Sequence, residues 1–493
     1  MAFAITQTCC ADASCVTVCP VNCIHPPPDE PDFATTDMLY VDPRACIDCG
    51  ACADACPVDA IFPVDALTAP LRPYAEINAG YYADRDPVTP DPSPNFHAWG
   101  PPDFSRTIPA GFPRLSVAVV GSGPAGMYAV QDLLLHTTAR VTVLDRLPVA
   151  GGLVRFGVAP DHPSTRGIGE AFARLHHHPR LRLRLGVEVG RDVSADDLAE
   201  RYDAVIYAVG AAAPRPLGIP GEHLSVAATT VVGWYNGHPD VPADAIDLSA
   251  ERVVIVGTGN VALDVARILT ADPADLAGTA IAPHALAALR ASKVREVVLV
   301  SRGGPETAAY TSQELLALTQ RAGAGLVVDT HDPRIPTAID AAVAKAGLLR
   351  GVDQAAVDWS APPAHDRRRI VLRFHSTPLA ITGDPTVRAL WVVGTGGAVE
   401  IATNQVVRAV GHRTTPLPGL PFDQTTGTIA NTAGRVTGRP GTYVVGWAKR
   451  GATGGIGANR TCAAETVSAL LEDATTESRG TRSRHHPVAR SHG

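Results

Sequence analysis

The chain has 493 residues, of which 45% are apolar and 18% are charged, and its net charge is −7. This length allows two to four domains, and the composition is that of an ordinary globular protein. No apolar run approaches the ~20 residues of a membrane-spanning helix, and no strongly basic field is present, so we expect neither membrane insertion nor nucleic-acid binding. The first residues show no basic region followed by a long apolar core, so we expect a cytoplasmic protein.

The first 66 residues are acidic and rich in cysteine. They hold ten acids, one base and nine of the ten cysteines, so their net charge is −9 and the rest of the chain carries +2. Crowded cysteines in a chain without a secretory signal favour metal ligation over disulfides. We therefore expect residues 1–66 to form a metal-binding head that docks on the oppositely charged remainder.

The second half of the head carries a regular cysteine motif. Cys46, Cys49, Cys52 and Cys56, followed by Pro57, have the spacing C-x2-C-x2-C-x3-C-P. Three thiolates at this spacing wrap one iron–sulfur cluster, and the fourth ligates a second cluster. A zinc site would instead need two separated pairs of ligands.

The first half of the head is an imperfect copy, in which Asp12 stands where a cysteine is expected. A carboxylate is a harder and weaker iron ligand than a thiolate. The sequence thus predicts one [4Fe–4S] cluster on a four-cysteine set and a second cluster, [3Fe–4S] or [4Fe–4S], on a three-cysteine set. The four-cysteine set is Cys19, Cys46, Cys49 and Cys52; the three-cysteine set is Cys9, Cys15 and Cys56.

Three residues near these sets keep open roles. Asp12 is either a ligand that closes the second cluster or a solvated loop acid beside it. Cys10 is an alternative closing ligand, although Cys10 and Cys23 are better interpreted as non-ligands. Over about 60 residues the head resembles the seven-iron and eight-iron bacterial ferredoxins, which implies an α+β domain that transfers single electrons.

Residues 67–113 hold ten prolines, which remove hydrogen-bond donors and fix φ. We therefore predict a linker with neither a helix nor a central strand. Its aromatic residues, among them Trp99 and Phe112, argue against full disorder, so we expect it to lie extended along the surface of the following domains.

The stretch from Ser116 to Asp145 has the order strand, glycine turn, helix, strand and acid. The β-branched run Val117–Val120 predicts a buried parallel strand, and an apolar helical pattern runs through Leu135. Val141–Leu144 predicts a second strand, which ends on Asp145. This order is typical of a dinucleotide-binding unit.

Each glycine in this turn has a physical role. Gly121 permits the tight turn, Gly123 lets backbone N–H groups approach a pyrophosphate, and Gly126 lets the helix pack on the sheet. Asp145 can accept hydrogen bonds from ribose hydroxyls. The alternative is a glycine turn in some other α/β unit.

A second phosphate loop contains Gly257, Gly259, Asn260 and Val261, in a GxGxxA pattern that enters another apolar helix. Its later strand, 297–300, ends on Arg302 instead of an acid. A guanidinium suits a ribose 2′-phosphate, whereas the alternative for Arg302 is an exposed surface charge.

Further motifs extend this picture over the rest of the chain. They include GLVRFGVAPDHP at 152–163, GWYNG at 233–237, GNVALDVARIL at 259–269 and GWAKRGATGGIG at 446–457. With these motifs, residues 114–470 resemble the adrenodoxin-type ferredoxin–NADP reductases, flavoproteins of the glutathione-reductase fold. Together with the head, the chain resembles the actinobacterial ferredoxin/ferredoxin–NADP reductase fusions.

The resemblance implies an α/β fold with two Rossmann-like nucleotide domains, FAD in the first and NADP(H) in the second. It implies that the FAD is lined by Ala125, Leu153, Val189, Trp447, Gly454, Gly455 and Ile456. It also implies that Glu314 and Gly454 contact NADP. Family members usually carry two adjacent arginines where this chain has Arg302-Gly303, so discrimination against NADH should be weaker.

Two candidates remain weaker. Asp161 and His162 lie in the APDHP loop, and because hydride transfer needs no enzymic base, we expect His162 to act electrostatically or in docking. Trp447 has core filling as its alternative role. The expected division is a ferredoxin domain at 1–66, a linker at 67–113, an FAD domain at 114–220 and 401–473, an NADP domain at 221–400, and a disordered tail at 474–493.

The sequence therefore predicts an oxidoreductase that moves electrons from NADPH through FAD to the clusters of its head. An external acceptor, such as a free ferredoxin or a cytochrome P450 system, would receive them. Two alternatives are an electron-input subunit like that of glutamate synthase, whose cysteine spacing differs, and a nucleotide-binding redox sensor.

Overall fold

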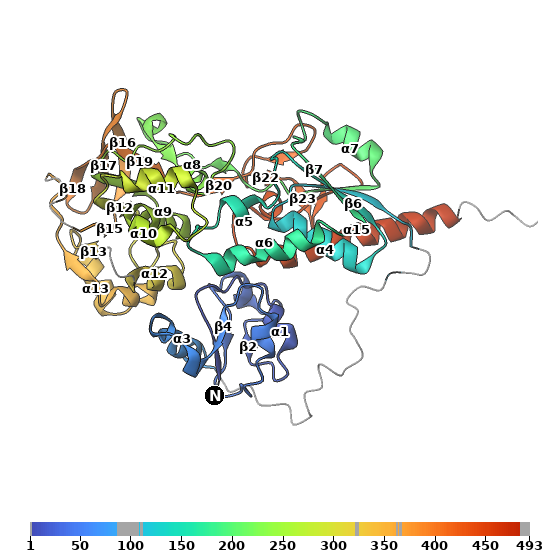
Figure 1. Cartoon of the computed structure of the whole chain (residues 1–493), viewed down its shortest axis with the longest axis horizontal. Helices are drawn as coiled ribbons and strands as arrows, with labels where there is room; N and C mark the ends of the chain where they lie inside the picture. The colour runs from blue at the N-terminus through green and yellow to red at the C-terminus, as the bar shows by residue number, and fades with distance from the viewer. Residues whose placement is uncertain are drawn as a thin grey trace, which may run out of the picture.

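The computed structural model describes residues 2–85, 108, 112–320, 325–360, 363 and 367–483. These residues form the N-terminal head and a body with two large sheets (Figure 1). The head lies below the body in this view, next to helices α4 (Pro124–His136) and α12 (Ser312–Thr319). Among the described residues, no helix combines the length and the apolar character needed to span a membrane.

The head is built from two similar halves. Each half contributes a short helix that follows a residue with left-handed backbone, Ala13 (φ 60°) or Gly50 (φ 75°), and that ends at a cysteine, Cys19 or Cys56. Two antiparallel strand pairs, β1 with β4 and β2 with β3, hold the halves together. The elements are β1 (Phe3–Ile5), α1 (Ser14–Val18), β2 (Ile24–His25), β3 (Tyr40–Val41), α2 (Ala51–Ala55) and β4 (Ile61–Pro63).

A helix follows where the crowding of prolines predicted none. This helix, α3 (Pro73–Tyr81), begins with Pro73 at its first position, where a missing N–H costs nothing because the first N–H groups of a helix have no partner inside the helix. The prediction that residues 67–113 contain no helix is wrong, whereas the boundary at residue 67 stays a prediction. Residues 86–107 and 109–111 lie outside the described residues, so the path of the linker stays a prediction.

The side chain of Asn78 explains why α3 belongs to the head. Its amide nitrogen donates to the carbonyl of Ile5 at 2.8 Å. Its Oδ1 accepts from the backbone N–H of Ile5 at 3.1 Å and of Val41 at 2.9 Å. One buried amide therefore satisfies backbone groups of β1 and β3 together, as buried polar groups require.

The first sheet of the body has the strand order β23-β24-β25-β8-β5-β6-β7, and its five strands from β25 to β7 run parallel. The chain moves to opposite sides of β5 for β6 and β8, which makes the carboxyl end of β5 a topological switch point. The strands are β5 (Ser116–Val120), β6 (Arg140–Asp145), β7 (Leu181–Leu185), β8 (Ala204–Tyr207), β23 (Asn431–Thr432), β24 (Arg435–Val436) and β25 (Thr442–Val444). Its helices besides α4 are α5 (Gly152–Phe156), α6 (Pro163–Leu175), α7 (Ala195–Arg201), α14 (Trp447–Arg450) and α15 (Ala458–Ser483).

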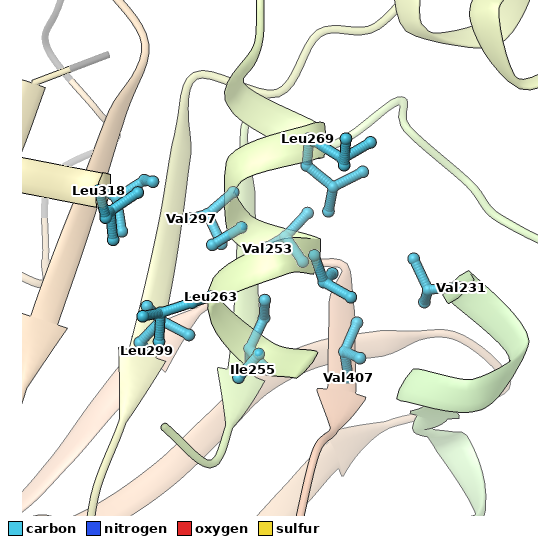
Figure 2. Packing of buried hydrophobic residues seen from close by; sticks show 14 of the residues in the cluster. Val231, Val253, Ile255, Leu263, Leu269, Val297, Leu299, Leu318 and Val407 are labelled. Atoms are coloured by element: carbon cyan, nitrogen blue, oxygen red, sulfur yellow. The ribbon is translucent and has the colours of Figure 1, made fainter. Parts of the chain in front are cut away.

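The second sheet has the order β10-β19-β11-β12-β15-β13-β14 and is parallel throughout. In Figure 2, Leu263 and Leu269 of α9 (Asn260–Thr270) lie over Val253, Ile255 and Val297 of the central strands, so α9 buries its apolar side on the sheet. The strands are β10 (Val226–Ala227), β11 (Arg252–Val256), β12 (Glu296–Val300), β13 (Gly325–Asp329), β14 (Asp353–Ala355), β15 (Arg369–Arg373) and β19 (Gln405–Arg408). Its other helices are α8 (Ala228–Tyr235), α10 (Pro273–Leu276), α11 (Pro283–Arg290), α12 and α13 (Arg334–Asp340). A separate antiparallel sheet holds β16 (Thr377–Gly383), β17 (Val387–Gly394) and β18 (Gly397–Ala402).

The predicted α/β class is confirmed, with a strand, a glycine turn and a helix at both phosphate loops. Helix α15 continues past the predicted domain end at 473 to Ser483, so the predicted disordered tail is helical at its start. The first turns of α15 pack on α4, and a helix that is already nucleated propagates into polar sequence at little cost. Residues 484–493 lie outside the described part of the chain.

A buried acid joins three neighbouring strands of the second sheet. Glu296 has no exposed surface and lies in register between Arg252 of β11 and Arg369 of β15. One carboxylate oxygen contacts Arg252, and the other accepts from Nε of Arg369 at 2.6 Å. The negative charge of Glu296 thus offsets the positive charges of two guanidinium groups on the two neighbouring strands.

We predict that Glu296→Ala destabilises this unit by about 3–5 kcal/mol, because the variant leaves buried guanidinium charge without its acid. The thermal unfolding midpoint, followed by circular dichroism, should fall by several degrees. Glu251→Ala is the matched control, since Glu251 is an exposed acid just before β11. Equal midpoints for the two variants would contradict the prediction.

Candidate functional site

Both phosphate loops turn close to the backbone that follows a neighbouring strand. Gly121 and Gly257 have left-handed φ values of 111° and 121°. A Cβ at Gly121 would lie 2.4 Å from the carbonyl oxygen of Ala208, and one at Gly257 would lie 2.3 Å from that of Ala409. Both alanines directly follow a neighbouring parallel strand, so each turn passes too close to the sheet for any side chain.

The helices that follow these turns begin in the same way. Gly123 precedes α4 with φ −73° and ψ 179°, and Gly259 precedes α9 with φ −76° and ψ 171°. Neither helix has a side-chain cap, so its first N–H groups remain available to an anion. A Cβ at Gly126 would lie 2.1 Å from the carbonyl oxygen of Gly121, which explains the third glycine of the first loop.

Asp145 is held in place at the end of β6. Its Oδ2 accepts from the backbone N–H of Ser122 at 2.8 Å and from the Ser122 hydroxyl, and its Oδ1 accepts from the N–H of Leu147 at 2.9 Å. A carboxylate has about four acceptor sites, so capacity remains for a ribose hydroxyl. The sequence reasoning missed Ser122, whose hydroxyl also accepts from the N–H of Gly151 at 3.2 Å.

Two distant segments converge on the start of α4. A Cβ at Gly152 would lie 2.7 Å from Cα of Gly123, and a Cβ at Gly446 would lie 2.5 Å from Cβ of Ala125. The start of α5 and the 446–457 segment therefore surround the first phosphate loop. Leu153, the second residue of α5, keeps 48% of its surface exposed.

The other residues assigned to FAD differ in exposure. Trp447 is half-buried, and its indole N–H donates to the carbonyl of Gly454 at 3.1 Å. This position disfavours the core-filling role. Gly454 and Gly455 are exposed and Ile456 is half-buried, whereas Val189 is buried in the core of the first sheet.

At the second loop, Asn260 connects two helices. Its Oδ1 accepts from the N–H of Thr311 at 2.8 Å, and Thr311 caps α12, the helix that carries Glu314. Arg302 is exposed two residues after β12, and Val261 keeps 36% of its surface exposed. Of the predicted NADP residues, Asn260, Val261 and Arg302 thus follow strands of the second sheet, whereas Gly454 lies in the 446–457 segment of the first unit.

A polar cluster lies between the two nucleotide units. Side-chain ligand atoms of His162, Asp264 and Glu314 all lie within 4.8 Å of one another. Arg267 contacts Asp161 and Asp264, which ties the APDHP loop to α9. Burial, followed by the charge of Glu314, raises the pKa of Asp264 well above its usual range. The sequence reasoning missed Asp264 and Arg267, because both looked like ordinary positions of an amphipathic helix.

Cys19, Cys46, Cys49 and Cys52, the four-cysteine set, line one cavity in the head together with Cys23. Their assignment to one cluster stays a prediction. Burial raises the pKa of the Cys52 thiol to about 12 and that of Cys9, in the three-cysteine set, to about 11. Thiolates are costly in such surroundings unless a metal compensates their charge, so these donors fit iron–sulfur clusters.

Asp12 is neither solvated nor free to turn. Its side chain is 8% exposed, its Oδ1 accepts from the N–H of Ser14 at 3.3 Å, and its Oδ2 lies 3.3 Å from Nη1 of Arg460. The solvated-acid interpretation is therefore wrong, because the body covers this loop. Arg460 was missed, since nothing in its sequence context marks it. Cys10 and Cys23 belong to neither cysteine set. The sulfur of Cys23 lies 3.5 Å from that of Cys19.

Among the described residues, the head touches the body at the 446–457 segment and at α12. A Cβ at Gly457 would lie 2.2 Å from the carbonyl oxygen of Cys10, so the Cys10 loop lies directly on the 446–457 segment. At the second place, Asp37 accepts from the N–H of Ser312 at 2.9 Å, and Leu316 of α12 packs into the core of the head. The loop between Cys9 and Cys15 therefore lies on the 446–457 segment.

Comparison with known proteins agrees with this architecture. Residues 115–314 match the family model "Pyridine nucleotide-disulphide oxidoreductase", and residues 39–62 match "4Fe-4S binding domain". The chain is 46% identical over 487 residues to the "Probable ferredoxin/ferredoxin--NADP reductase" of Mycobacterium tuberculosis, covering 96% of this chain and 84% of the relative. The chain belongs to the ferredoxin/ferredoxin–NADP reductase family. It is an NADPH-dependent flavin oxidoreductase with a 4Fe–4S binding domain.

Two further relatives match the reductase body. "NADPH-ferredoxin reductase FprA" of M. tuberculosis is 44% identical over 401 residues, with 75% of this chain and 86% of that protein covered. The mouse "NADPH:adrenodoxin oxidoreductase, mitochondrial" is 40% identical over 389 residues, with 72% and 78% covered. The solved structure of FprA in complex with NADPH superposes with a TM-score of 0.69 at 41% identity, covering 75% of this chain and 86% of that one.

We predict that Arg302→Ala raises the KM for NADPH by about 10- to 100-fold, because a charged hydrogen bond contributes roughly 1.5–3 kcal/mol. The KM for NADH, which lacks the 2′-phosphate, should stay within about twofold. Steady-state reduction of ferricyanide measures both constants. Arg295→Ala is the matched control, since Arg295 is exposed at the opposite end of the same strand. An equal loss with both nucleotides would remove Arg302 from 2′-phosphate recognition.

Proposed function

We propose that the reductase moves electrons from NADPH through FAD to the iron–sulfur clusters of its own head, and from there to an external acceptor. The observation that carries this proposal is the contact of the Cys10 loop with Gly457. This contact holds the loop between Cys9 and Cys15 against the 446–457 segment, which supports electron transfer into the three-cysteine set. Bound FAD supplies the chemistry that joins two-electron and one-electron carriers, since it accepts a hydride and gives up electrons singly.

The first nucleotide unit supplies the FAD residues in this proposal. The N–H groups at the start of α4 bind the pyrophosphate, which Gly121, Gly123 and Gly126 allow to approach, and Asp145 accepts from the ribose. Ala125, Leu153, Trp447, Gly454, Gly455 and Ile456 line the remainder of the flavin. Val189 supports it from the buried core.

The second nucleotide unit supplies the NADP residues. Gly257, Gly259, Asn260 and Val261 form its phosphate loop, and the exposed guanidinium of Arg302 binds the 2′-phosphate. Glu314 of this unit and Gly454 of the FAD unit lie on the nicotinamide side. We keep His162 and Asp161 as electrostatic elements between the units, since Arg267 and Glu314 already surround them with charge.

The clusters follow from the two cysteine sets. We assign a [4Fe–4S] cluster to the four-cysteine set and a [3Fe–4S] cluster to the three-cysteine set. The engagement of Asp12 with Ser14 and Arg460 supports three iron atoms, because it turns the carboxylate to the body. Cys10 contributes its backbone to the contact with Gly457, which supports its role as a non-ligand.

We infer the domain division from the packing. The head ends near Arg85, whose guanidinium lies 2.7 Å from Asp32, and a linker runs from there to about residue 113. The FAD unit comprises about 114–220 and 401–483, and the NADP unit about 221–400. A free ferredoxin or a cytochrome P450 system remains our proposal for the acceptor, and the cytoplasmic location stays a prediction.

The proposed electron path is tested by adding NADPH to anaerobically purified enzyme and recording EPR spectra. Flavin, iron and sulfide content are measured on the same sample. NADPH should reduce both flavin and clusters. Reduction of the flavin without any cluster signal would contradict the proposal.

Gly457→Ala should slow electron transfer from the flavin to the clusters without slowing reduction of the flavin by NADPH. Because the added Cβ meets head backbone, the head must shift, and we expect flavin-to-cluster transfer to slow by about tenfold or more. Ferricyanide reduction by NADPH should stay within about twofold. Stopped-flow spectroscopy measures both rates, and flavin content shows that the site is intact. Gly278→Ala is the matched control, because open space surrounds Gly278; unchanged transfer in Gly457→Ala would refute the docked arrangement.

Salt should weaken the same contact. Raising ionic strength from about 0.05 M to about 0.5 M screens the half-exposed Arg460–Asp12 pair, so flavin-to-cluster transfer should slow by about two- to fivefold. Arg460→Gln should be slower at low salt and should lose most of this salt dependence. Transfer that is insensitive to salt in both proteins would exclude an electrostatic contribution to docking.

A further inference from the structure

The two cysteine sets of the head face different surroundings. The loop that carries Cys9 and Cys15 lies against the body, through the contacts of Cys10 with Gly457 and of Asp12 with Arg460. In the four-cysteine set, by contrast, Cys49 is exposed. Cys49 is thus the exposed member of the two sets, whereas the body lies on the loop between Cys9 and Cys15.

Apolar side chains flank the open set. Val18 precedes Cys19 and is 40% exposed, and Ile47 follows Cys46 and is 58% exposed. Among the described residues, the exposed large apolar side chains are Val18, Ile47, Leu135, Leu153, Val261, Val343 and Leu379. Leu153 and Val261 lie at the proposed FAD and NADP sites, where a ligand covers them. Val18 and Ile47 likewise neighbour residues of a proposed redox site. Exposed apolar side chains at such a site offer contact area to another molecule.

The charge around this set is negative. Asp48 is exposed between Ile47 and Cys49, and Asp54 is exposed on α2, the helix that carries Cys52. The only base among residues 1–66 is Arg44, and it is paired with Asp42. An apolar centre with acidic surroundings complements a protein that has apolar contact area and a positively charged rim.

We propose that Val18, Ile47, Asp48 and Cys49 form the docking face for an external one-electron acceptor protein with a positively charged rim around its redox centre. The face is used while the head stays docked on the body. Electrons enter the head at the three-cysteine set and leave at the four-cysteine set, so the head is a fixed relay. This inference rests on the proposed function.

The overall reaction balances without a further reactant. One NADPH gives two electrons and becomes NADP⁺ with release of one proton. Two acceptor molecules each take one electron at the docking face. No bond to the acceptor forms or breaks, and only electrons cross the interface.

The test uses holoenzyme and cytochrome c, a basic haem protein, as the probe. Ile47→Ser combined with Asp48→Lys should weaken binding of cytochrome c, measured by calorimetry at low salt, by about tenfold or more. Cytochrome c reduction should fall in parallel, whereas ferricyanide reduction should not. Iron and sulfide content and the EPR spectrum confirm that the clusters remain.

The matched control places the same changes on the body. Leu135→Ser combined with Asp244→Lys removes one exposed apolar side chain and reverses one exposed acid there. Binding by this variant should equal that of the unmodified enzyme. Equal weakening in both variants, or none in the head variant, would overturn the docking face. A concentration-dependent dimer that only the head variant abolishes would assign the face to a second copy of the chain instead.

A locked head tests the relay. Asp37→Cys and Ser312→Cys, at the second head–body contact, can be joined by a short bifunctional maleimide. The cross-linked enzyme should still reduce cytochrome c at a rate within about twofold of the uncross-linked double variant, since the docking face stays open. Loss of this activity, with NADPH still reducing the clusters by EPR, would overturn the relay alone. Clusters that NADPH does not reduce in the unmodified enzyme would overturn the proposed function itself.

Discussion

The closeness of two backbones, at Cys10 of the head and Gly457 of the body, is the constraint on which the rest of this enzyme depends. No side chain fits at Gly457, and the approach brings the cysteine loop of the head onto the segment beside the first phosphate loop. Fusion keeps donor and acceptor at a high effective concentration, but concentration alone does not orient them. The orientation comes from this contact, with Arg460 adding an ion pair at its edge.

The two nucleotide units have the same backbone geometry at their phosphate loops. They differ in the charged residue that follows the second strand of each unit. Gly121 and Gly257 turn against the carbonyl groups of Ala208 and Ala409 in the same way, and both loops lead into an uncapped helix. The difference lies at the end of the second strand. An anchored Asp145 suits a ribose hydroxyl, whereas Arg302 suits a phosphate. In the function that we propose, one fold accepts two dinucleotides through a change of charge at a single edge.

The acidic residues of the head form specific contacts in addition to keeping its surface polar. Asp12 and Asp37 contact the body, Asp42 pairs with the sole base of the first 66 residues, and Asp48 remains exposed beside Ile47. A position that the cysteine repeat assigns to a cluster ligand thus holds a docking group. The negative charge of the head thus faces the body at Asp12 and Asp37 and faces solvent at Asp48.

The sequence by itself determined the local chemistry of this protein. Cysteine spacing predicted the four-cysteine set that lines one cavity, and the order of strand, glycine, helix and acid predicted β5, α4 and β6, because these signals depend on residues close together in the chain. Only the tertiary structure decided that α3 belongs to the head, that Asp12 meets Arg460, and that His162 lies with Asp264 and Glu314. Each of these depends on contacts between distant segments, and neither spacing nor periodicity carries information about which distant segments meet.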